Sequence, residues 1–193
     1  MPRATNLPEI RVGHLITMSD DTGLIQHAAY SIPNRWHGYC TDDNARALVA
    51  AMLHWELTED EDLLPHATRY LGFLHHAYDT EAHSFHNFLR YDRRWDDADH
   101  LSEDAAGRAM WGLGMVVAAA PTEGMKGLAT RGMGDILPDA ERFTTPRGWA
   151  FALLGIHAYL RRYSGDALAR RTRQVLARRL CDAFSHPATP DCP

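Results

Sequence analysis

Cysteines, long apolar runs and an excess of positive charge are all scarce or missing in this sequence. Its three cysteines, Cys40, Cys181 and Cys192, lack the spacing of a metal site, and their odd number favours a reducing compartment over a disulfide framework. No apolar run approaches the roughly 20 residues that span a bilayer, and the first residues lack the apolar stretch of a signal peptide. The formal net charge of −5 supplies no overall basic field. The sequence therefore predicts a cytoplasmic protein that binds neither membrane nor nucleic acid.

A motif of two acidic residues followed by an arginine occurs twice, each time at the expected start of a helix. The copies read YCTDDNARAL and LSEDAAGRAM, and an ungapped alignment pairs Asp42 with Asp104 and Arg46 with Arg108. In each copy one acid stands four residues before the arginine, so Asp42–Arg46 and Asp104–Arg108 have the spacing of i,i+4 ion pairs. Helices that begin in this way are expected to present their acidic ends together at one end of the molecule.

A third stretch, residues 143–155, aligns with residues 102–114 at a spacing of 41 residues but has threonines in the acidic positions. Thr145 is a good N-cap and Pro146 stands at the first helical position. Ser102 and Thr41 are expected to cap the other two helices in the same manner.

The apolar pattern predicts six helices, over residues 41–56, 60–78, 103–119, 122–141, 145–161 and 165–184. The first, third and fifth have few charges in their middles and should be buried on most sides, whereas the second and sixth are amphipathic. The fourth contains four glycines, each costing about 1 kcal/mol in a helix, and is assigned from its place in the alternation. This order predicts an all-α fold, a partial α/α toroid of three helical hairpins with inner and outer helices alternating.

The chain of 193 residues, 45% of them hydrophobic, is large enough for one domain with its own core. We expect an N-terminal extension over residues 1–13, the partial toroid domain over 14–184 and a disordered tail over 185–193. Residues 14–40 contain several turn-forming residues. Residues 84–95 predict a long loop or short hairpin lying over the acidic helix ends.

Two strings extend the acidic motif into a recognisable pattern, MSDDTGLIQHA at residues 18–28 and GYCTDDNARAL at residues 38–48. Together with Asn87-Phe88-Leu89, Tyr91-Asp92-Arg93-Arg94-Trp95, Ser102-Glu103-Asp104 and Gly107-Arg108-Ala109, they resemble a bacterial family of α/α-toroid domains. That family is termed glycosyltransferase-associated, because its members occur beside or fused to sugar-nucleotide glycosyltransferases. The fold of the family is similar to that of the six-hairpin glycosidases.

The resemblance implies a carbohydrate-active domain of a bacterial glycosyltransferase system. Such toroids have six hairpins and this chain supplies three, so it looks like the N-terminal half of the domain. Its expected partners are a carbohydrate, a glycosyltransferase or the missing half of the toroid. No nucleotide-binding element is recognisable, so the chain is not expected to be a sugar-nucleotide transferase by itself.

The candidate catalytic residues are Asp42, Asp43, Glu103 and Asp104. Carboxylates in a first helical turn are also explained by the helix dipole, which they stabilise by about 0.3–1 kcal/mol. Their occurrence in pairs favours a role in sugar binding or in acid–base chemistry. Glycoside hydrolysis requires two carboxyl groups about 5–5.5 Å or 6.5–9.5 Å apart, and neighbouring helix axes lie roughly 8–10 Å apart. One acid of each pair could therefore share a site.

A wider set of polar and aromatic residues is expected to contact the sugar. It comprises Asp20, Asp21, Gln26, His27, Trp36, Tyr39, Arg46, Asn87, Tyr91, Arg93, Trp95 and Arg108. Turn formation for the polar members and core packing for the aromatic ones remain alternatives. The twelve histidines lack metal-site spacing, so neither a metal nor a cofactor is expected. Three hypotheses follow: a glycan-binding or glycan-processing domain, a glycoside hydrolase, and a non-catalytic helical interaction module, with enzymatic activity left undecided.

Overall fold

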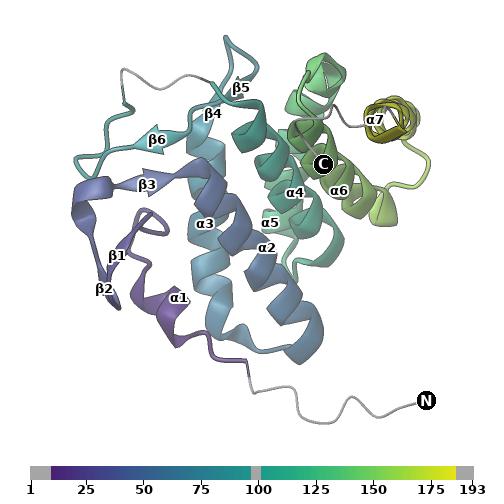
Figure 1. Cartoon of the computed structure of the whole chain (residues 1–193). Helices are drawn as coiled ribbons and strands as arrows, with labels where there is room; N and C mark the ends of the chain where they lie inside the picture. Colours follow the sequence, from purple (N-terminus) through teal and green to yellow (C-terminus); the bar gives the residue numbers. More distant parts are fainter. Residues whose placement is uncertain (1–9, 97–100, 186–193) are drawn as a thin grey trace.

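The computed structural model describes residues 10–96 and 101–185, in which long helices dominate (Figure 1). These helices are α2 (Thr41–Thr58), α3 (Leu64–Ala77), α4 (Glu103–Ala119), α5 (Glu123–Ile136), α6 (Pro146–Arg162) and α7 (Ala167–Ser185). All six predicted helices are confirmed. Two predicted helices each consist of an α-helix and a short 3₁₀ helix: η2 (Glu61–Leu63) precedes α3, and η3 (Leu137–Arg142) follows α5.

The long helices form two layers. Helices α2, α4 and α6 lie side by side, with α4 in the middle, and α3, α5 and α7 pack against α2, α4 and α6 respectively (Figure 1). The middle helix is the most buried, because neighbours cover it on three sides. The all-α fold and the alternation of the two layers are thus confirmed, and the partial-toroid arrangement stays a prediction.

Helices α4 and α6 touch through glycines that stand 41 positions apart. A Cβ atom on Gly114 would lie 2.1 Å from the carbonyl oxygen of Gly155, and one on Gly107 would lie 2.9 Å from that of Gly148. The two helices therefore approach backbone to backbone, which only residues without side chains permit. The repeat spacing read from the sequence is the spacing at which the two helices lie in register.

Short elements fill the segments between the long helices. They are α1 (Gly13–Thr17), β1 (Ala28–Ala29), β2 (Ile32–Pro33), η1 (Arg35–His37), β3 (Tyr39–Cys40), β4 (Tyr78–Asp79), β5 (Ser84–Phe85) and β6 (Phe88–Leu89). Strands β4 and β5 form a hairpin directly after α3, which spans residues 78–85 and so overlaps the predicted 84–95 segment only at its end. Strand β6 pairs antiparallel with β3, Tyr39 opposite Leu89 and Cys40 opposite Phe88. The segment containing β6 is thereby joined to the chain that enters α2, a strand pairing that the sequence did not predict.

The helix caps agree with the sequence prediction at one site and differ at two. Thr145 caps α6, its hydroxyl accepting the N–H of Gly148 at 3.2 Å. Ser102 stands at the N-cap of α4 without a side-chain bond, and Thr41 lies inside α2, its hydroxyl donating to the carbonyl of His86. The predicted capping bonds of Ser102 and Thr41 are therefore wrong. For Thr41 the reason is the pairing of β3 with β6, which draws its hydroxyl to the neighbouring segment.

The predicted terminal segments lie largely outside the described residues, which begin at residue 10 and end at Ser185, the last residue of α7. Gly13, placed in the N-terminal extension by the sequence, begins α1. None of the described helices has the length and hydrophobicity needed to cross a membrane.

Candidate functional site

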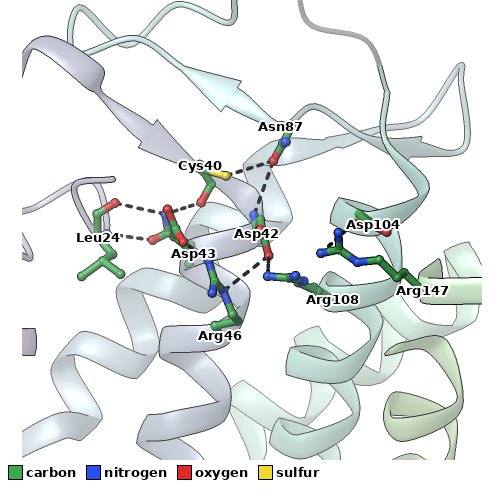
Figure 2. A network of polar contacts seen from close by, with 10 residues as sticks. Leu24, Cys40, Asp42, Asp43, Arg46, Asn87, Asp104, Arg108 and Arg147 are labelled. Carbon is green, nitrogen blue, oxygen red and sulfur yellow. Dashed lines mark hydrogen bonds and ion pairs between the residues drawn. The ribbon is translucent and has the colours of Figure 1, made fainter. Parts of the chain in front are cut away.

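Asp42 stands in the first turn of α2 and joins that helix to α4. Its carboxylate accepts a hydrogen bond from the guanidinium of Arg108, and the Nε of Arg46 lies 3.5 Å away (Figure 2). Arg108 is only 8% exposed and its guanidinium carbon lies 4.4 Å above the ring of Phe151 on α6. A cation over an aromatic face is attracted by the ring quadrupole. Arg108 therefore contacts all three helices of its layer.

Asp104, in the first turn of α4, pairs with Arg147 of α6 at 3.0 Å (Figure 2). The expected pair of Asp104 with Arg108 inside α4 is wrong, because Arg108 turns instead to Asp42 on α2. The acidic residues thus follow one rule at both junctions: the acid at the start of one helix takes an arginine from the next helix of the layer. The pair expected inside α2, Asp42 with Arg46, is confirmed.

Glu103 caps the neighbouring helix α6. Its two carboxylate oxygens accept the backbone N–H groups of Thr144 and Thr145 at 2.8–2.9 Å and both threonine hydroxyls at 2.8–3.0 Å. Burial opposes ionisation of Glu103, but the hydrogen bonds from Thr145 and Thr144 outweigh it and lower the pKa of this carboxyl. Glu103 is therefore an ionised, fully engaged acceptor that holds α6 against α4.

Asp43 has the opposite electrostatic environment. Burial raises the pKa of Asp43, since the half-buried carboxylate is incompletely solvated, and the charge of Asp42 adds to this effect against the attraction of Arg46. The guanidinium of Arg46 donates to Asp43. The pKa of Asp43 is therefore shifted upward, in the direction opposite to that of Glu103.

Asn87 and Asn44 fix the chain that leads into α2. The Oδ1 of Asn87 accepts the thiol of Cys40 at 3.1 Å and the N–H of Asp42 at 3.5 Å. The fully buried amide of Asn44 accepts the N–H of Leu24 at 2.8 Å and donates to the carbonyl of Cys40 at 2.9 Å. Burial raises the pKa of Cys40 to about 12, so this thiol stays protonated. The expected ligand-binding role of Asn87 is thus accompanied by a structural one.

Two further predicted residues, Asp20 and Asp21, are engaged within the fold. Asp20 accepts two backbone N–H groups of its own turn and the hydroxyl of Tyr39, the last at 2.6 Å. Burial and this carboxylate raise the pKa of Tyr39. Asp21 forms an exposed ion pair with Arg93 at 2.7 Å. These contacts support the turn-forming alternative for Asp20, and they pin the 14–40 segment to the loop after β6.

The predicted aromatic residues divide between exposed and packed positions. Trp36 is 91% exposed, whereas Trp95 packs against the rings of Phe73, His76 and His86. Tyr91 stacks on the buried Tyr39 with 6.2 Å between ring centroids. Core packing therefore accounts for Trp95 and Tyr39, while Trp36 presents a free ring face.

Two hollows border these helix ends, and a third lies along η1 and β6. One is lined by Ser102, Glu103, Asp104, Thr144, Thr145, Pro146 and Arg147; a second by Leu15, Leu24, Asp43, Arg46, Ala47 and Ala50; a third by Gln26, Trp36, His37, Phe88, Leu89, Arg90 and Asp96. Asp43 thus lines one hollow and Glu103 and Asp104 line another. In Figure 2 the Asp42–Arg108 pair lies between Asp43 and Asp104. His27, whose ring meets that of His37 at 4.6 Å, lies near the third hollow.

A scan of protein-family models and a search of curated proteins find no match for this chain. Within residues 10–96 and 101–185 no group of histidine, cysteine and acidic residues could hold a metal ion. The sequence analysis missed Arg147, Thr144 and Asn44. The 41-residue alignment carried the signal for Thr144, which it places opposite Glu103; the partners of Arg147 and Asn44 are set by the tertiary packing.

Proposed function

We propose that this chain is a carbohydrate-binding domain whose glycan site lies at the N-terminal ends of α2, α4 and α6. The observation that carries the proposal is the row of cross-helix pairs there, Asp42 with Arg108 and Asp104 with Arg147. Sugar hydroxyls both donate and accept hydrogen bonds, so paired carboxylates and guanidiniums offer acceptors and donors in fixed positions. Charged groups also form the stronger hydrogen bonds.

The third hollow, lined by residues of η1 and β6, offers a second kind of contact. The exposed indole of Trp36 stands with Gln26 and Arg90 along one wall, and Phe88 is 41% exposed. An aromatic face packs against the C–H face of a pyranose, and amide or guanidinium groups bind its hydroxyls. A glycan could span from this hollow toward the acidic helix ends.

Binding is better supported than hydrolysis, because most of the acids are engaged by the fold. Glu103 accepts from Thr144 and Thr145 and has a lowered pKa, which is unsuited to a general acid at neutral pH. Asp43 favours hydrolysis as the second candidate, since its pKa is raised in the direction that a general acid requires.

The family resemblance adds the biological setting: a glycosyltransferase system in bacteria, with a glycosyltransferase or further toroid hairpins as the protein partner. This setting is part of the proposal and rests on the sequence motifs alone.

Glycan arrays followed by calorimetry with the array's ligand test the binding proposal. Asp104→Asn removes the charged acceptor paired with Arg147 and should weaken binding at least about tenfold, or about 1.4 kcal/mol. The matched control is Glu56→Gln, which breaks the 2.6 Å pair with Arg161 between the other ends of α2 and α6. That variant should bind normally. Failure of the wild-type chain to bind any glycan, or equal losses in both variants, would contradict the proposal.

The aromatic contact is tested separately. Trp36→Ala should weaken binding, whereas Phe184→Ala, which removes a 92% exposed ring on α7, should not. For the hydrolase candidate the assay is release of reducing sugar. Asp43→Asn should abolish release while leaving glycan binding, and a wild-type chain that binds glycans without releasing sugar would eliminate this candidate.

A further inference from the structure

A separate pocket opens on the outer layer, between α3, α4 and α5 and the β4–β5 hairpin. Its volume is about 100 Å³. The floor is apolar, formed by Leu71, Leu74, Phe85, Leu113 and Leu128, and the rim carries His75, Tyr78, Thr80 and Asp135. The pocket shares no lining residue with the three hollows described above.

Gly132 on α5 keeps this space open. A Cβ atom at this position would lie 3.2 Å from a methyl carbon of Leu113, so any larger side chain would enter the pocket. An apolar cavity of comparable size, on the order of 150 Å³, is known to stay dry and accept benzene. The floor therefore fits one small apolar ring, which would replace contacts that the surrounding leucines otherwise lack.

The rim of the pocket carries one carboxylate, that of Asp135, together with the imidazole of His75, and two further carboxylates act on the rim from outside it. Burial raises the pKa of the Tyr78 hydroxyl, and the charges of Asp135, Asp139 and Asp79 raise it further, so three carboxylates act on this one rim group. Asp139 lies within ion-pair distance of Arg142 and His83. Asp79 lies within ion-pair distance of His86. Asp135 is exposed and forms no ion pair with any residue that the structure describes. A cationic group held at the rim would complement this charge.

From these observations we infer that the pocket is a binding site for a small aromatic amine. The ring occupies the floor between Leu74, Leu113 and Leu128, and the ammonium group faces the carboxylate of Asp135. The inference is independent of the glycan site and holds or fails without it.

Methyl-detected NMR titration of the whole chain tests the assignment. Benzylamine, protonated at pH 7, should shift the methyl resonances of Leu74, Leu113 and Leu128 saturably. Benzyl alcohol should bind about three- to fivefold more weakly, because the free energy of an exposed ion pair corresponds to this ratio of Kd values. Benzoate, which carries the same charge as Asp135, should bind more weakly still. Asp135→Asn should remove the preference for the amine and leave the binding of benzyl alcohol unchanged.

A filling variant with a matched control completes the experiment. Gly132→Leu should abolish the shifts for both ligands, whereas Gly134→Ala, on the same helix with nothing within 4 Å of its Cβ position, should leave them intact. The wild-type titration needs no variant to fold. Shifts located elsewhere, no saturation, equal binding of benzoate, or a folded Gly132→Leu that binds as the wild type does would each overturn the inference.

Discussion

The contact of α4 with α6 predicts a large penalty for one added methyl group. In Gly114→Ala the new Cβ would lie 2.1 Å from the carbonyl oxygen of Gly155 and within 3 Å of two further backbone atoms of that residue. Backbone cannot rotate away as a side chain can. The two helices must therefore separate by about 1 Å, a gap that forfeits a quarter to a half of each dispersion contact along the interface.

The magnitude follows from two opposing effects. Overpacking a tight contact costs about 1–3 kcal/mol and occasionally more, and the alanine offsets up to about 1 kcal/mol of this by its helix propensity. The approach of the added Cβ to backbone at 2.1 Å places the overpacking cost at the upper end of its range. We expect Gly114→Ala to lower the free energy of unfolding by about 1–3 kcal/mol. The control is Gly134→Ala on α5, where the added methyl meets nothing and should raise the free energy of unfolding by about 0.5–1 kcal/mol.

Urea melts of the two variants and the wild type measure this difference. With a slope of about 2 kcal/mol per M, Gly114→Ala should move the midpoint down by about 0.5–1.5 M. A variant as stable as the wild type, or more stable, would refute the backbone-to-backbone packing of α4 and α6. The same separation should loosen the Asp104–Arg147 pair, so glycan binding should weaken together with stability.

Two further predictions concern α6 and the outer faces of its layer. Glu103→Gln replaces an acceptor-only carboxylate by an amide whose NH₂ faces donors of Thr144 and Thr145, and should cost about 1–2 kcal/mol at pH 7. Because the folded-state pKa of Glu103 is lowered, this carboxylate stabilises the fold above its unfolded pKa near 4.5, and the stabilisation is lost as the pH falls through the folded-state pKa. The free energy of unfolding of Glu103→Gln should therefore depend less on pH in acid than that of the wild type. Leu53 and Leu57 on α2 and Leu154 on α6 are 44%, 73% and 44% exposed. We expect the isolated chain to self-associate or to bind a partner through these helices, because exposed apolar faces normally mark interfaces. A monodisperse monomer in light scattering would contradict this prediction.

The glycosyltransferase setting and the partial-toroid arrangement remain predictions, whereas the positions of the helices followed from local features of the sequence. Thr145 and Pro146 predict the start of α6 correctly, because an N-cap hydrogen bond and the fixed φ of proline depend only on residues within one helical turn. The 41-residue spacing carried information beyond single helices. It places Glu103 opposite Thr144 and Gly114 opposite Gly155, since parallel helices of one layer repeat the same register.

The partners of the charged side chains were decided only by the tertiary structure. Spacing along one helix suggested that Arg108 pairs with Asp104, yet Arg108 reaches Asp42 across the layer and rests on Phe151. That choice depends on the offset and distance between helices, which short-range periodicity does not encode. For the same reason the division of the acidic pairs between two hollows, and the tie of Asn87 to Asp42 through β6, could not be read from the sequence. Local chemistry determined where each helix begins; long-range packing determined which groups meet at those beginnings.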